Sequence, residues 1–95
     1  MHRPTRSDEG DASHAEVLER IRRYVINAFR DGRAEGIGAS TPLVTSGIID
    51  SAGVLQVIDW LESSFGIVIE DDAVSAENFD TLDALATLVR ARARR

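Results

Sequence analysis

Apolar residues recur at helical spacing in three stretches of the chain, and polar or glycine-containing segments separate these stretches. The first stretch follows Ser13-His14-Ala15-Glu16, a capping-box pattern with serine at the cap and glutamate three residues later. This pattern predicts a helix that runs to about Arg30 and ends at Asp31-Gly32. Its inward positions are Val17, Leu18, Ile21, Tyr24, Val25 and Ala28.

The second stretch predicts a helix from about Ser51 to Ser64, closed by Phe65-Gly66. Its apolar face is formed by Val54, Val57, Ile58, Leu61 and Phe65. Four residues lie off this face and are expected to point outward: Ala52, Leu55, Asp59 and Glu62. Trp60 also lies outside the apolar stripe, and we expect it to be half-buried against the preceding loop or the third helix.

A last helix is predicted from about Asp80, with Leu82, Leu85, Ala86 and Val89 facing inward. Before it, residues 67–69 read as an extended connector, residues 70–72 as a turn, and residues 74–79 as one or two helical turns capped by Ser75. The loop over residues 33–50 is long for a compact domain. We expect four apolar residues to anchor it: Ile37, Leu43, Val44 and Ile48.

These elements predict an all-α fold, an up-and-down four-helix bundle of three longer helices and one short helix with a long first loop. The domain is expected over residues 13–92. Residues 1–12 are polar and are expected to form a disordered leader, and residues 93–95 a frayed arginine-rich tail.

The charged residues are distributed unevenly along the chain. All eleven basic residues are arginines, and none lies between Arg33 and Arg90, an interval that holds ten acidic residues. A central acidic field repels nucleic acid and attracts basic protein surfaces, although it also fits a merely solvated face. We therefore expect no nucleic-acid partner. No run approaches transmembrane length and no secretory signal is present, so we expect a cytoplasmic protein without membrane contact.

No set of residues forms an active site of its own. A hydrolase would need a base beside its serine, and the two histidines, His2 and His14, lie in or near the expected leader. Cysteine is absent, and the acidic run from Glu70 to Asp72 lacks the spacing of a calcium loop. We expect neither catalysis nor a metal site.

The most informative segment is Gly47-Ile48-Ile49-Asp50-Ser51 at the start of the second helix. Side-chain oxygens of Asp50 and Ser51 can accept from the first free N–H groups of that helix. The same N–H groups and the helix dipole favour a negative charge at Ser51. A phosphate ester on this serine would therefore occupy a suitable electrostatic environment.

Together with the Phe65-Gly66 stop and the following Ile67-Val68-Ile69, this segment resembles the acyl carrier proteins and peptidyl carrier domains. The resemblance runs from about Val17 through Val89. It implies an acyl-carrier-like bundle in which Ser51 receives a 4′-phosphopantetheine arm from coenzyme A. A separate phosphopantetheinyl transferase would attach the arm with Mg²⁺, and Asp50 would help to hold that ion and the phosphate.

The family's arm ends in a thiol, which carries an acyl or aminoacyl group as a thioester. The resemblance thus implies a monomeric shuttle between a loading enzyme and a downstream synthase or transferase. Partner-facing residues are expected on the second helix and in the acidic stretch after it: Ala52, Leu55, Asp59, Glu62, Glu70, Asp71 and Asp72.

The chain departs from the fatty-acid-synthesis pattern after the serine, where it has Ala52, Gly53 and Gln56, and at Asp59. Gly53 also lowers the helix propensity of the first turn by about 1 kcal/mol relative to alanine. The run is closer to stand-alone carriers of specialised metabolism. Polyketide-type acyl, nonribosomal-peptide-type aminoacyl and lipid-synthesis cargo all stay open. The alternatives from other classes are a helical interaction adaptor, in which Ser51 is only a cap, and a small nucleic-acid binder using the arginine-rich ends.

Overall fold

The computed structural model describes residues 13–93, and the fold over this range is entirely helical. Its elements are α1 (His14–Phe29), α2 (Ser51–Phe65), the short 3-10 helix η1 (Asp71–Ala73), α3 (Ala76–Phe79) and α4 (Leu82–Ala93). The expected three longer helices and one short helix are confirmed. Of the expected flanking segments, residues 1–12 and 94–95 lie outside the described residues, whereas Ala93 is the last residue of α4.

Helix α1 begins and ends where the sequence predicts. Ser13 accepts from the Glu16 N–H, and the Glu16 side chain accepts from the Ser13 N–H, which completes the capping box. At the other end, Asp31 and Gly32 have positive φ angles of 52° and 83°. The Gly32 N–H donates to the Ile26 carbonyl and satisfies one of the last free acceptors of the helix.

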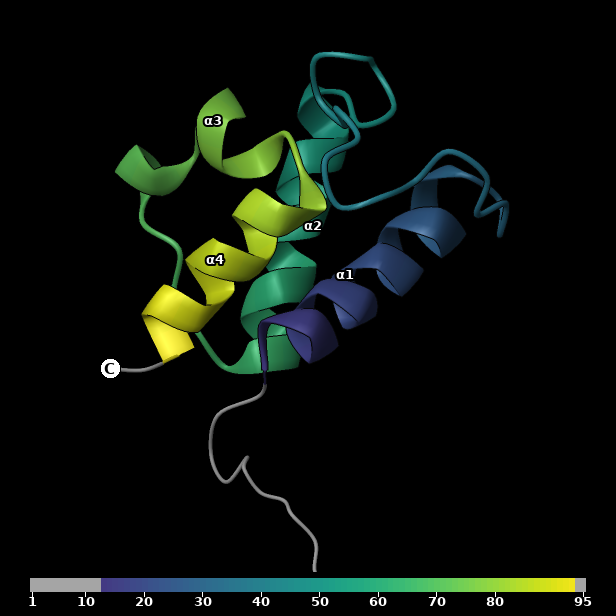
Figure 1. The fold of residues 1–95 in the computed structure, drawn as a ribbon. Coiled ribbons are helices and arrows are strands. Elements are labelled where there is room, and N and C mark those ends of the chain that lie inside the picture. Colours follow the sequence, from purple (N-terminus) through teal and green to yellow (C-terminus); the bar gives the residue numbers. More distant parts are fainter. Residues whose placement is uncertain (1–12, 94–95) are drawn as a thin grey trace, which may run out of the picture.

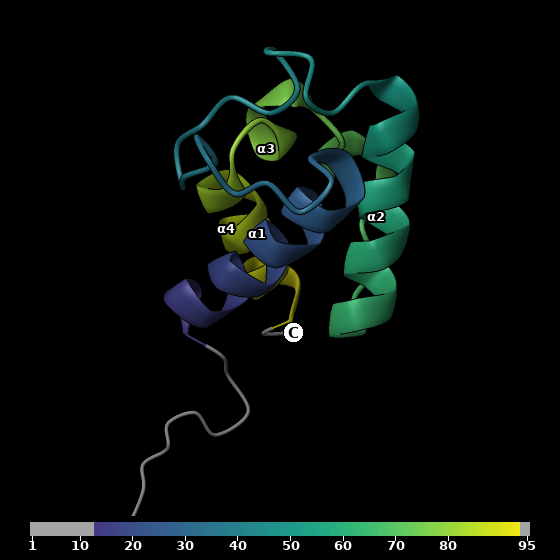
Figure 2. The ribbon, with the colours of Figure 1, turned by 90° about the vertical axis from the view of Figure 1, so that its right-hand side faces the viewer.

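The core lies between α1, α2 and α4, with α1 packed most extensively against α4 (Figure 1). Figure 2 shows the loop between α1 and α2 passing over the end of the bundle where α2 begins. The largest fully buried side chains come from the three longer helices and this loop: Ile21, Val25, Leu43, Ile49, Val57, Leu61, Leu82, Leu85 and Val89. The predicted inward residues of α4 are all buried.

Two predictions about the packing of α1 and α2 are wrong. Ala28 is exposed, and Ile26, which was not predicted, is buried in its place. The apolar stripe of α1 has two possible edges, and spacing alone does not show which edge the neighbouring segments cover. Trp60 is half-buried as expected, but it stacks on Tyr24 of α1 and not on the loop or the third helix.

Burial alternates along the connector after α2, residues 67–69. Ile67 and Ile69 are buried, and Val68 between them is 72% exposed. The expected turn at residues 70–72 is the start of η1, and Ser75 caps α3 by accepting from the Asn78 N–H. The connector therefore fills the core from one side without forming a strand.

Asp80, between α3 and α4, fixes the long loop to the rest of the fold. Its Oδ1 accepts from the backbone N–H groups of Leu43, Val44 and Thr45 at 3.1, 2.8 and 3.0 Å. Its Oδ2 accepts from the Thr45 hydroxyl at 2.9 Å. We call this group of bonds the Asp80 clasp. It satisfies three consecutive loop N–H groups that have no helix or sheet to join.

The clasp stabilises the charged form of the carboxyl. The Thr45 N–H is the largest cause that holds the pKa of Asp80 below its ordinary value of 3.8, against an opposing effect of desolvation. The Thr45 hydroxyl and then the N–H groups of Val44 and Leu43 lower the pKa further. The stability that the clasp contributes is therefore complete above the ordinary pKa and is lost as the pH falls through the lower, folded-state pKa.

We predict that Asp80→Asn lowers the free energy of unfolding at neutral pH, because a neutral amide accepts less strongly from the loop N–H groups. The difference from the wild type should shrink as the pH falls from about 4 through the lower folded-state pKa of Asp80, where the folded wild-type carboxyl also becomes protonated. Urea denaturation at a series of pH values measures both effects. Asp72→Asn, at an exposed carboxyl, is the control. A difference that does not change with pH would contradict this account.

Candidate functional site

The start of α2 is built by Asp50, whose backbone is extended (φ −89°, ψ −174°). Asp50 Oδ1 accepts from the Gly53 N–H at 2.8 Å, and its carbonyl accepts from the Val54 N–H at 2.9 Å. Asp50 is thus the N-cap and Ser51 is the first helical residue. The prediction that both residues lie at this joint is confirmed, and the capping oxygen belongs to Asp50.

Ser51 is exposed, and its hydroxyl makes no hydrogen bond within residues 13–93. The N–H groups of Ser51 and Ala52 likewise have no acceptor in that range. The positive end of the α2 dipole therefore lies beside a free hydroxyl. This arrangement suits a serine that is esterified with an anionic group, because the group would meet unpaired donors.

An open hollow of about 380 Å³ lies next to Ser51. The loop, the first turns of α2 and the segment around α3 line it: Val44, Ser51, Val54, Leu55, Val74, Ser75, Ala76 and Phe79. The walls are mainly apolar, with the Ser51 and Ser75 hydroxyls as the polar side-chain groups. Val44 is also one of the residues whose N–H binds Asp80, so the clasp positions one wall of the hollow.

The residues predicted to face partners fall into two groups. Ala52, Leu55, Asp59, Asp71 and Asp72 are exposed, and Leu55 is 66% exposed although it is apolar. The other two make internal contacts. Glu62 is half-buried and accepts from the Ile69 N–H at 2.9 Å, and Glu70 forms an ion pair with Arg92 at 2.9 Å.

The model of the family described as "Phosphopantetheine attachment site" matches residues 19–89, which include the whole of α2 and the hollow. The chain belongs to this family. It is also similar to a probable acyl carrier protein, PigG, of Serratia sp. (strain ATCC 39006), with 28% identity over 67 residues, 70% of this chain and 77% of the relative.

The carrier assignment establishes the class of function and the prosthetic group. Members of the family are carriers and not catalysts, and their cofactor is covalently attached 4′-phosphopantetheine. Within residues 13–93, no cluster of histidine, aspartate or glutamate side chains could hold a metal ion. None of the helices in that range is long and apolar enough to cross a membrane.

The sequence did not predict most of the walls of the hollow in this carrier protein. Val74, Ala76 and Phe79 are far from Ser51 along the chain, and only the folded connector brings them near it. The signal available in the sequence was Val74, an apolar residue in an acidic segment. In the fold, the Val74 side chain stays 36% exposed. An unexplained exposed apolar residue near a predicted site is a useful indication of a lining position.

The structure explains why position 53 is a glycine, which helix propensity did not indicate. A Cβ on this residue would lie 2.9 Å from Cε1 of Phe29 and 3.0 Å from Cγ2 of Ile49, closer than such atoms pack. It would also lie 3.2 Å from the capping Oδ1 of Asp50. The absence of a side chain lets the end of α1 and the loop approach the first turn of α2.

We predict that Gly53→Ala fails to stabilise this carrier and costs up to about 2 kcal/mol, since overpacking of about 1–3 kcal/mol outweighs a propensity gain of about 1 kcal/mol. Ser63→Ala, at an exposed position of the same helix, is the matched control and should be neutral or slightly stabilising. Thermal and urea unfolding of both variants measures the difference. A gain of stability at Gly53 would show that Phe29 moves aside without cost.

Proposed function

We propose that Ser51 bears the 4′-phosphopantetheine arm and that the protein carries an acyl or aminoacyl intermediate between partner enzymes. The observation that carries this proposal is the free Ser51 hydroxyl at the first turn of α2, within the segment matched by the family model. The unpaired N–H groups of Ser51 and Ala52 would stabilise the phosphodiester.

The surroundings of Ser51 fit this prosthetic group. When bound, the group supplies the thiol that holds the cargo as a thioester, and the protein itself has no cysteine. The mainly apolar hollow beside Ser51 offers a surface to the non-polar parts of the arm and its cargo. The Ser75 hydroxyl, which also lines the hollow, can accept hydrogen bonds from amide groups or donate to them.

We assign Asp50 a role during attachment of the arm in addition to capping. Only its Oδ1 is engaged by the helix, and Oδ2 makes no hydrogen bond within the described residues. An exposed carboxylate oxygen beside Ser51 can contact the Mg²⁺ that a phosphopantetheinyl transferase brings. Capping and ion contact therefore use different oxygens of one side chain.

The proposed docking surface for these enzymes surrounds Ser51. Ala52 and Leu55 provide a small apolar contact, and the carboxylates of Asp59, Asp71 and Asp72 are exposed and suited to basic partner surfaces. Glu62 and Glu70 are less suited, because one oxygen of each carboxylate is already engaged in an internal contact. Such an interface would be small and sensitive to salt.

For the pathway, we propose a polyketide-like or nonribosomal-peptide-like synthesis, with lipid-synthesis cargo as the alternative. The departures at Ala52, Gly53 and Gln56 favour specialised metabolism. The relative is named an acyl carrier, which favours acyl over aminoacyl cargo. A helical adaptor without an arm is the competing function, and it would leave the free hydroxyl of Ser51 without a purpose.

We predict that incubation with coenzyme A, Mg²⁺ and a broad-specificity phosphopantetheinyl transferase adds one phosphopantetheine group, detected by intact mass. Ser51→Ala should show no gain and should stay folded by circular dichroism, because Asp50 and not Ser51 supplies the cap. A wild-type protein that stays unmodified by two such transferases would favour the adaptor.

We further predict that Asp50→Asn slows attachment of the arm about 10–100-fold, a loss typical of removing a group that supports a metal site. Asparagine caps a helix as well as aspartate does, so the thermal midpoint should change little. The rate is followed by intact mass at fixed enzyme concentration. An unchanged rate in the folded variant would restrict Asp50 to its capping role.

A further inference from the structure

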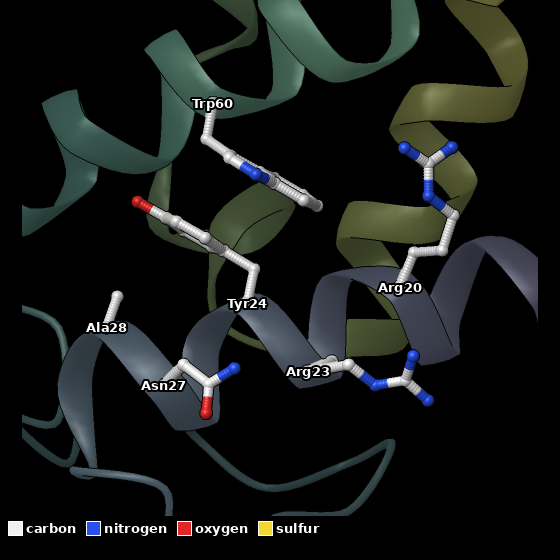
Figure 3. A pocket seen from close by; sticks show the side chains of 6 residues that line it. All are labelled: Arg20, Arg23, Tyr24, Asn27, Ala28 and Trp60. Atoms are coloured by element: carbon white, nitrogen blue, oxygen red, sulfur yellow. The ribbon is translucent and has the colours of Figure 1, made fainter.

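A second open groove, of about 480 Å³, lies between α1 and α2 and takes no part in the function proposed above. Five residues of α1 and one of α2 line it: Arg20, Arg23, Tyr24, Asn27, Ala28 and Trp60 (Figure 3). We call it the α1–α2 groove. It combines two cations with two aromatic rings, whereas the hollow beside Ser51 is lined by apolar and hydroxyl groups.

The aromatic part of the groove is held rigidly. Figure 3 shows the rings of Tyr24 and Trp60 face to face, with centroids 4.3 Å apart and an interplanar angle of 8°. Phe65 meets Trp60 edge-on at 5.7 Å. The Tyr24 hydroxyl donates to the Gln56 carbonyl at 3.4 Å. The rings are half-buried, so they present a fixed, partly exposed apolar surface.

The two arginines keep donors available. The Arg20 guanidinium lies 4.3 Å from the centroid of the Phe65 ring and forms no ion pair with a carboxylate of residues 13–93. A cation–π contact orients the guanidinium and leaves N–H groups free to donate. Arg23 is largely exposed and has one ion pair in that range, to Glu19 at 3.6 Å, which is a weak surface interaction.

Two carboxylates limit where an anion can bind in the groove. Glu19 lies beside Arg23. Burial raises the pKa of the Tyr24 hydroxyl, and the nearby Asp59 carboxylate raises it further. An anion is therefore favoured at the Arg20 end of the groove and disfavoured at the Tyr24 hydroxyl end.

We propose that the α1–α2 groove docks an acidic segment of a partner protein. Carboxylates of that segment would bind the guanidinium groups of Arg20 and Arg23, and an apolar side chain would pack on Tyr24 and Trp60. Arginine suits this role because its planar fork matches a carboxylate in bidentate geometry. The Asn27 amide can donate to or accept from the backbone of the segment.

The position of the groove allows this contact while Ser51 stays accessible. Trp60 is nine residues after Ser51 on α2, which corresponds to about 13 Å along the axis and about half a turn around it. The groove and Ser51 therefore lie on different sides of α2. A partner in the groove binds through arginines, whereas partners at Ser51 would meet the carboxylates of Asp71 and Asp72.

The test uses the intrinsic fluorescence of Trp60, which is the only tryptophan of the chain. The full protein is titrated with a short peptide that carries paired glutamates beside a leucine. The expected result is a saturable change in Trp60 emission that weakens with added salt. The same peptide with glutamine in place of glutamate should bind more weakly, and this comparison needs no protein variant.

The groove variant carries Arg20→Gln and Arg23→Gln together. The matched control carries Arg33→Gln and Arg90→Gln, which remove the same charge outside the groove. The groove variant should bind the glutamate peptide about three- to tenfold more weakly, as expected for two exposed ion pairs, and the control should bind like the wild type. The Ser51→Ala protein should also bind like the wild type, which separates this proposal from attachment of the arm.

Three outcomes would overturn the proposal. The first is no change of Trp60 emission with the glutamate peptide, and the second is equal binding of the glutamine peptide. The third is a change of emission with protein concentration alone, which would mean that a second copy of the chain occupies the groove.

Discussion

The clasp between Asp80 and the long loop is the interaction on which the rest of the structure depends. A loop of this length has many backbone donors that no helix satisfies, and its ordering must overcome a large conformational entropy. One carboxylate accepts from three consecutive N–H groups and from the Thr45 hydroxyl. It thereby fixes the register of the loop against α3 and α4, and Leu43 within the fixed segment and Ile49 after it are both buried.

The same constraint determines how α2 begins. Because the loop ends with Ile49 buried, Asp50 is held at the surface in an extended conformation and its side chain turns back to cap the helix. Gly53 then permits Phe29 of α1 to close over the first turn. Ser51 lies between Asp50 and Gly53, whose positions are fixed by these contacts, and its own side chain contributes nothing to the fold. A hydroxyl that has no structural role is free to be modified without loss of stability.

The sequence predicted the features that depend on local spacing, which include the helices, the capping box and the joint at Asp50 and Ser51. It could not predict pairings between residues that are distant along the chain. The stacking partner of Trp60, the walls of the hollow at Val74 and Phe79, and the clasp at Asp80 all depend on how separate elements meet. Asp80 in particular resembles a helix cap in the sequence, and its role appears only when the loop lies beside it.

A carrier must be recognised by several enzymes in turn, and the two docking surfaces proposed above fit this demand. Contacts that form and break quickly need small interfaces with exposed charges, because large apolar surfaces would hold one partner too long. In this chain, the exposed acids of η1 are near the hollow beside Ser51, and the arginines of α1 are on another side of α2. Surfaces of opposite sign reduce competition between partners, since an enzyme attracted by one surface is repelled by the other. The Tyr24–Trp60 stack packs α1 against α2 on the side of α2 away from Ser51, so a partner bound in the α1–α2 groove would leave Ser51 accessible.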